Sequence, residues 1–131
     1  MSESIKKYLG VDWGEKRIGL ATADSETDLA LPLKTVATLA EVLNAVKEEE
    51  IDIIVLGSPQ KMSGAVADNA AWHNFLEQLK ERSGRRVELV DERLTSLAAD
   101  ALAGEEGEKA ERDEIAATII LQDYLDRQAI A

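Results

Sequence analysis

The stretch KYLGVDWGEKRIGLATA, residues 7–23, decides the fold class of this chain. Its first part, Lys7–Asp12, is a short apolar run that ends at a carboxylate, a pattern typical of a buried strand. Gly14 permits a tight turn, and Arg17–Ala23 predicts a second strand that pairs with the first as a hairpin. Residues 30–36 predict a third strand, in which a proline indicates an edge position or a bulge.

Downstream of this meander, predicted strands alternate with predicted helices. Residues 52–57 are apolar and β-branched without alternation, which is typical of a central strand covered on both faces. A further strand is predicted over 86–90, and helices are predicted over 39–49, 67–82, 95–102 and 113–128. This order predicts an α/β fold in one domain, residues 1–131: a mixed sheet of three antiparallel and two parallel strands, with helices on both faces.

The last predicted helix combines an apolar stripe with an acidic start. Ile115, Ile119 and Leu125 predict its core face, and Asp113 opens it. The segment before it, residues 104–111 (GEEGEKAE), is polar and glycine-containing, and we expect a loop there.

Composition excludes several kinds of chemistry. The chain has 131 residues, 15 basic against 26 acidic, and a net charge of −11. It contains no cysteine and a single histidine, so thiolate sites, disulfides and multi-histidine metal sites are excluded. The acidic balance opposes nonspecific binding to nucleic acid or anionic membranes. No apolar run approaches the roughly 18 residues of a membrane span, so we expect a cytoplasmic protein that does not bind membranes.

Three carboxylates stand at element ends, where a site would form. Asp12 and Glu92 each follow a predicted strand, and Asp113 begins a helix. In an open α/β sheet the carboxyl ends of strands meet at one crevice, so these residues could converge there. Oxygen ligands favour Mg²⁺ or Mn²⁺, and a pair of such ions can hydrolyse a phosphodiester. With 26 acidic residues, some also fall at strand ends by chance, and Asp113 would also suit a helix start.

Four motifs in order along the chain resemble one known family. They are residues 10–21 (GVDWGEKRIGLA), residues 55–64 (VLGSPQKMSG), residues 87–96 (VELVDERLTS) and residues 113–125 (DEIAATIILQDYL). Together they resemble the YqgF/RuvX-type, RNase H-like nucleases over nearly the whole chain. The chain differs from the usual family loop by having Lys61 in place of Asn and Ser63 in place of Asp, and it is more acidic before Asp113.

The resemblance implies an RNase H-like fold and a two-metal active site. Asp12, Glu92 and Asp113 would be the catalytic carboxylates that hold Mg²⁺ or Mn²⁺, with Asp91 as a supporting residue. The implied activity is hydrolysis of structured nucleic acid, with maturation of the 5′ end of precursor 16S rRNA favoured. A DNA endonuclease resembling a Holliday junction resolvase is the alternative.

The resemblance also implies where the nucleic acid is held. Lys16, Arg17, Lys61 and Arg93 lie in or beside the motif loops and are expected to contact phosphates, for which basic side chains are suited. The expected partners are precursor rRNA, branched DNA and the ribosome, with the protein a monomer or a homodimer, because junction cleavage needs two active sites.

Two other function classes remain open from the sequence. The acidic surface and altered loop are also compatible with a noncatalytic RNA- or ribosome-associated factor on the same fold. An ATP-using protein of the actin and sugar-kinase type has a similar first motif, but such proteins close two lobes around the nucleotide and this chain has the length of one.

Overall fold

The computed structural model describes residues 5–59, 70–91 and 109–130. An antiparallel meander opens the fold, made of β1 (Lys7–Trp13), β2 (Ile18–Asp24) and β3 (Leu31–Val36). β1 and β2 pair along their whole lengths, and β2 pairs with β3 through one register irregularity. β3 is an edge strand and contains Pro32, as the sequence predicts, because a proline cannot donate to a neighbouring strand.

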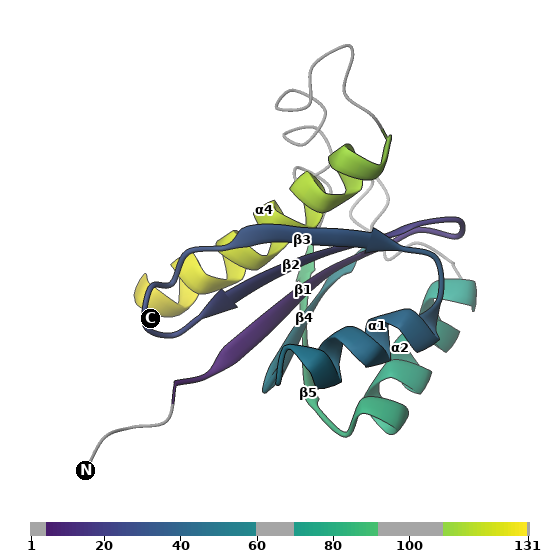
Figure 1. Ribbon diagram of the computed structural model, residues 1–131, viewed down its shortest axis with the longest axis horizontal. Helices are drawn as coiled ribbons and strands as arrows, with labels where there is room; N and C mark the ends of the chain where they lie inside the picture. Colours follow the sequence, from purple (N-terminus) through teal and green to yellow (C-terminus); the bar gives the residue numbers. More distant parts are fainter. Residues whose placement is uncertain (1–4, 60–69, 92–108, 131) are drawn as a thin grey trace.

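Two more strands extend the sheet on the other side of β1. β4 (Ile53–Ser58) runs parallel to β1, and β5 (Arg86–Asp91) runs parallel to β4, so the order is β3-β2-β1-β4-β5 (Figure 1). Every residue of β4 is buried, as expected for an apolar strand without alternation. The predicted sheet of three antiparallel and two parallel strands is therefore confirmed.

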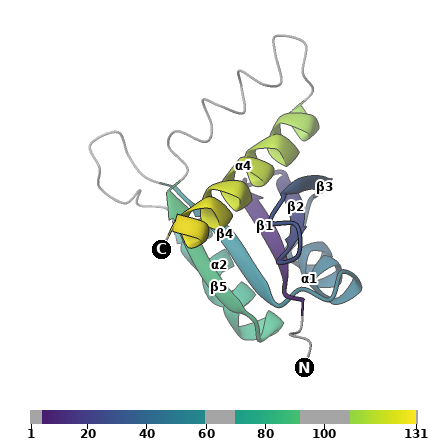
Figure 2. The same cartoon turned by 90° about the vertical axis from the view of Figure 1, so that its left-hand side faces the viewer.

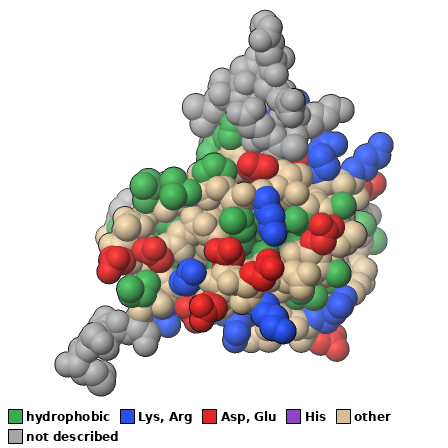
Figure 3. Space-filling model, in the orientation of Figure 1, with side chains coloured by type: hydrophobic (Ala, Val, Ile, Leu, Met, Phe, Trp, Pro, Cys, Tyr) green, Lys and Arg blue, Asp and Glu red, His purple; other side chains and the backbone are tan. Residues whose placement is uncertain are grey.

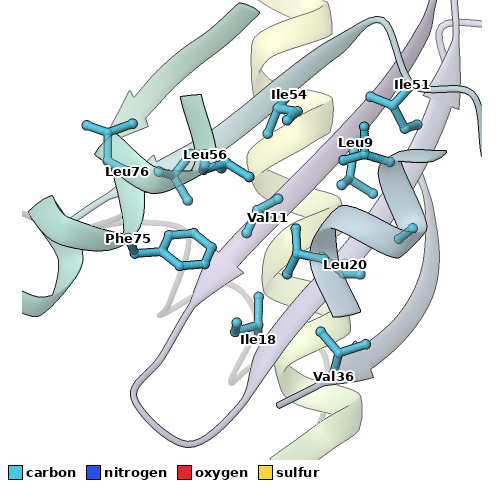
Figure 4. Close-up of a cluster of buried hydrophobic side chains, with 14 of the residues drawn as sticks. Leu9, Val11, Ile18, Leu20, Val36, Ile51, Ile54, Leu56, Phe75 and Leu76 are labelled. Carbon is cyan, nitrogen blue, oxygen red and sulfur yellow. The ribbon is translucent and has the colours of Figure 1, made fainter. Parts of the chain in front are cut away.

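One face of the sheet is covered by α1 (Leu39–Glu48) and α2 (Ala70–Ser83). α1 begins after Thr38, whose hydroxyl accepts a 3.3 Å hydrogen bond from the Glu41 N–H and so caps the helix. α2 is fixed to β4 by the buried Trp72, whose Nε1–H donates to the Gly57 carbonyl at 3.1 Å. Aliphatic side chains of β1, β2, β3 and β4 form one buried cluster with Phe75 and Leu76 of α2 in this layer (Figure 4).

The opposite face is covered by one long helix, α4 (Lys109–Ile130), which crosses in front of the strands in Figure 2. Its buried residues recur at helical spacing, as pairs four residues apart: Ala116 and Ala117, Ile120 and Leu121, and Tyr124 and Leu125. They form a second core with strand residues such as Ala21, Val55 and Val90. Helices therefore cover both faces, as predicted.

Two predictions about this last helix are wrong in detail. α4 begins at Lys109, so residues 109–111 are helical where a loop was predicted, and Asp113 lies in the second turn. Lys, Ala, Glu and Arg are all strong helix formers, and their charge does not prevent a helix. Ile115 and Ile119 are half-buried at the border of the core face, whereas Leu125 is buried as predicted. The helix predicted over 95–102 lies outside the described residues.

Within the described ranges, neither α1, α2 nor α4 combines the length and apolar character needed to cross a membrane.

Candidate active site

The carboxyl ends of β1, β4 and β5 lie at one edge of the sheet, because these three strands are parallel. Asp12 is the second-last residue of β1, and Asp91 is the last residue of β5. Crevices beyond the carboxyl ends of strands are the usual ligand sites of open α/β sheets. The fold therefore brings two of the sequence-predicted acidic positions to the edge where a site is expected.

The side chain of Asp12 faces α4. Asp12 lies opposite Gly19 in the antiparallel pair of β1 and β2. A Cβ atom at Gly19 would collide with the carbonyl group of Asp113 in α4, so that side of the hairpin faces the helix. Because directly opposite residues of an antiparallel pair point to the same face, Asp12 and the second turn of α4 share one side of the sheet. Two of the three predicted metal ligands thus approach the same place.

Two glycines allow α4 to come this close. Besides Gly19, Gly10 of β1 faces the helix, where a Cβ atom would lie 2.7 Å from the Ala117 carbonyl oxygen and 2.8 Å from the Leu121 Cβ. The main chain of α4 therefore lies almost directly on the main chain of β1 and β2 at these two glycines. As a result the backbone sets how near Asp113 lies to β1 and β2, with no intervening side chain to adjust.

Asp113 carries an ion pair that the sequence did not indicate. The Arg17 Nε–H donates to Asp113 Oδ2 at 2.8 Å, and the two side chains are 40% and 21% exposed. Arg17 directly precedes β2, and 96 positions separate the two residues. Charge-assisted bonds of this length are stronger than neutral ones, and partial burial reduces screening by solvent. Arg17, predicted to contact phosphate, is therefore engaged with a predicted metal ligand.

Further bonds hold α4 against the β3 side of the sheet. The Thr35 hydroxyl donates to Glu114 Oε2 at 3.0 Å, next to Asp113 in the chain. Two turns further along the helix, the Gln122 side chain accepts from the Ala30 N–H at 2.9 Å and donates to the Asp28 carbonyl at 3.1 Å. The helix is thus fixed at two points along its length, which limits how far Asp113 can shift.

Basic side chains lie beside this edge. Lys16 is exposed in the turn between β1 and β2 and next to Arg17. Lys and Arg side chains gather on the right of Figure 3, where that turn lies in Figure 1. The whole chain has a net charge of −11, so a local positive group of this kind is needed if a phosphate backbone is to approach.

Three predicted site residues, Glu92, Lys61 and Arg93, lie outside the described residues. Glu92 follows Asp91, the last residue of β5, directly in the chain. Asp91 is exposed at the edge of the sheet where β1, β4 and β5 end. Among the described residues alone, no three acidic or histidine side chains are grouped closely enough to hold a metal ion.

The described carboxylates nevertheless suit a hard divalent cation. Asp12 and Asp113 offer only oxygen donors, which Mg²⁺ and Mn²⁺ prefer. The pairing of Asp113 with a guanidinium shows that this position accepts a positive partner, since a partly buried carboxylate is stabilised by an opposite charge. The donor set therefore fits the ion that the sequence predicts.

A hollow of about 650 Å³ lies elsewhere, at the amino ends of β1 and β4. Charged residues of both signs line it, among them Lys7, Arg85, Glu50 and Asp52. It is at the opposite end of the sheet from Asp12, and we assign it no part in the site.

Comparison with known proteins agrees with this arrangement. A family model described as "RuvX: Holliday junction resolvase" matches residues 6–127. A Roseiflexus sp. (strain RS-1) protein named "Putative pre-16S rRNA nuclease" is 34% identical over 140 residues, which cover 98% of this chain and 99% of that protein. A Bacteroides fragilis (strain YCH46) protein of the same name is 37% identical over 138 residues, covering 96% and 100%.

Solved structures show the same fold at low sequence identity. Thermus thermophilus RuvC in complex with a Holliday junction substrate matches with a TM-score of 0.61 and 15% identity, over 94% of this chain and 96% of that chain. The fowlpox virus Holliday junction resolvase matches with a TM-score of 0.51 and 13% identity, over 95% and 99%. The fold is therefore RNase H-like.

Proposed function

The chain belongs to the RuvX family, and we propose that it is a nuclease that uses divalent metal ions to hydrolyse phosphodiester bonds in structured nucleic acid. The observation that carries this proposal is the approach of Asp113 in α4 to the side of the sheet that Asp12 faces, at the edge where β5 ends just before Glu92.

In this proposal Asp12, Glu92 and Asp113 hold Mg²⁺ or Mn²⁺, with Asp91 supporting them. The ions would supply an activated water and stabilise the leaving oxygen of the phosphodiester. The contact of α4 with Gly10 and Gly19 holds the main chain of Asp113 close to the hairpin that carries Asp12. Lys16 and Arg17, with Lys61 and Arg93, would orient the flanking phosphates.

The favoured substrate is the 5′ end of precursor 16S rRNA, because proteins at least 34% identical over nearly their whole length bear that name. The ribosome or its precursor would then be a partner, in the cytoplasm. The description of the family model favours the alternative, cleavage of four-way DNA junctions. A junction has two strands to cut, so that alternative requires a homodimer, whereas rRNA maturation can proceed with a monomer.

The test is cleavage of precursor 16S rRNA and of a four-way DNA junction, each with and without Mn²⁺. We expect Mn²⁺-dependent cleavage of the RNA, and loss of cleavage in the Asp12→Asn variant with an unchanged circular dichroism spectrum. The substitution keeps the size of the side chain but removes the charge that holds the cation. Turnover retained by a folded Asp12→Asn protein would refute the assignment.

A matched control is Asp52→Asn, at the amino end of β4, where the carboxylate accepts a hydrogen bond from the Lys7 N–H at 2.9 Å.

Cleavage of the junction alone would favour the DNA alternative. The absence of cleavage of either substrate, together with no rise in melting temperature at millimolar Mn²⁺, would favour a noncatalytic RNA-associated factor, because a ligand of the folded state must stabilise it.

A further inference from the structure

The guanidinium of Arg17 forms an ion pair with a carboxylate oxygen of Asp113, which is a proposed metal ligand. The Nε–H donates to Oδ2 at 2.8 Å, and the carboxylate keeps 21% of its surface exposed. A divalent cation bound by Asp113 would need the same carboxylate and would stand a few ångströms from the guanidinium. Like charges at that distance in a partly buried site repel each other. Arg17 and a divalent cation therefore compete for the carboxylate of Asp113.

The position of Arg17 allows it to leave. It precedes β2 at the turn of the hairpin, and its side chain is 40% exposed. Its long side chain can swing while the main chain stays paired, because Ile18 and the residues after it are held in register with β1. The guanidinium carries five N–H donors and is suited to phosphate oxygens once it is free of the carboxylate.

We propose that Arg17 is the internal counter-ion of Asp113, and that a divalent cation displaces it toward the phosphates of the substrate. This inference rests on the proposed function, since it concerns the same site. In the metal-free protein Arg17 neutralises Asp113 and holds α4 to the hairpin. In the loaded protein the cation takes over that neutralisation, and Arg17 becomes a phosphate-binding group, so metal loading prepares the surface for nucleic acid.

The first test is calorimetric titration of the full chain with MnCl₂, without nucleic acid. We expect Arg17→Gln to bind Mn²⁺ more tightly by about fivefold or more, because the competing charge is gone. Arg17→Lys keeps the positive charge and should keep an affinity near that of the wild type. Arg127→Gln is the matched control: it removes an Arg–Asp pair of similar length, 2.9 Å to Asp123, from the far end of the same helix.

The direction of the change separates this role from a merely structural one. If Arg17 only braces α4, its loss loosens Asp113 and the affinity for Mn²⁺ falls or stays the same, which would overturn the inference. If no cation binds to the wild type or to any variant, the proposed nuclease function fails as well. If Mn²⁺ binds all variants equally, the nuclease proposal stands and only the counter-ion role is refuted.

The second test observes the displacement directly, by the arginine Nε–H signals in a nitrogen-15 NMR spectrum with and without MgCl₂. The Arg17 signal, assigned by its loss in Arg17→Gln, should be shifted and slow to exchange in the metal-free protein. Saturating Mg²⁺ should move it toward the position of a solvated arginine, while the Arg127 signal stays in place. An Arg17 signal that does not change at saturating Mg²⁺ would contradict the proposal.

Discussion

Gly19 lets the main chain of α4 lie directly on the start of β2, beside Asp12 and Asp113. Its missing Cβ is the space that the Asp113 carbonyl occupies, and no flexible side chain is available to give way. Gly19→Ala should therefore destabilise the fold by about 3 kcal/mol, at the upper end of overpacking costs. It should also lower the affinity for Mn²⁺, because Asp113 moves with the helix. Urea unfolding and metal titration measure the two effects.

The control for this substitution is Gly84→Asn, at the end of α2. Gly84 has a φ of +65°, which asparagine tolerates, and a Cβ there meets nothing within 4 Å. We expect its stability to stay within about 0.5 kcal/mol of the wild type. An equal loss in both variants would mean that glycine flexibility, and not close approach of α4, decides the effect.

At the level of single residues, the sequence could indicate the acidic positions but not their partners. Asp12, Glu92 and Asp113 stand out because each lies at the end of a predicted strand or at the start of a predicted helix. The Arg17–Asp113 pair joins residues 96 positions apart. No periodicity links two such positions, so only the packed structure shows that one predicted phosphate contact is held by one predicted ligand.

Gln122 ties α4 as an element to the β2–β3 connection. Gln122→Ala removes two hydrogen bonds to this connection, one from the Ala30 N–H and one to the Asp28 carbonyl, and a third, exposed one to Asp126 Oδ1 within the helix. We expect a loss of about 1–2 kcal/mol, since each net hydrogen bond contributes near 1 kcal/mol. Gln128→Ala, on the exposed last turn of the same helix, is the control and should change little. Equal urea midpoints for both variants would refute the role of Gln122.

Tyr8 of β1 and Tyr124 of α4 join the same two elements, with ring centroids 6.1 Å apart. Burial raises the pKa of each phenol, helped by the charge of Asp28 for Tyr8 and of Glu88 for Tyr124. The folded protein thus keeps these protons to higher pH than the unfolded chain. The stabilisation is complete below the ordinary tyrosine pKa of 10 and is lost as pH rises above it.

The corresponding measurement is the free energy of unfolding between about pH 9 and pH 11, where unfolded tyrosine begins to ionise. We expect it to fall as pH rises, and to fall less steeply in Tyr124→Phe, which has no phenol to ionise. A wild-type curve that is flat over this range would contradict the assignment.

Among the elements, the strands were predicted best, because buried β-branched runs and a hairpin turn leave a strong local signal. The start of α4 was not: its first turn has no apolar spacing, so charge suggested a loop although the residues are helix formers. Ile115 and Ile119 were expected in the core by their apolarity. α4 packs so closely against Gly10 and Gly19 that its alanines face the sheet. Ile115 and Ile119 therefore lie at the border of the core.

The whole molecule carries a net charge of −11, so its contact with nucleic acid must depend on a few local cations. If Lys16, Arg17, Lys61 and Arg93 neutralise about four phosphates, raising salt from 50 to 200 mM should weaken RNA binding about 50-fold for a single-stranded site and about 150-fold for a duplex. Lys16→Gln should reduce this salt dependence, whereas Lys80→Gln, at the far end of α2, should not. Fluorescence anisotropy with labelled RNA measures both. Binding that does not change with salt would argue against this patch.

The two faces of the sheet also differ in the residues that they carry near the proposed site. Val11 points into the α1 and α2 layer and is fully buried, whereas its neighbour Asp12 faces α4. The proposed ligands Asp12 and Asp113 therefore lie on the α4 side of the sheet, away from the core beneath α1 and α2. Repacking the α1 and α2 side for heat tolerance should therefore leave unchanged the contact of α4 with Gly10 and Gly19, which brings the main chain of Asp113 close to the hairpin.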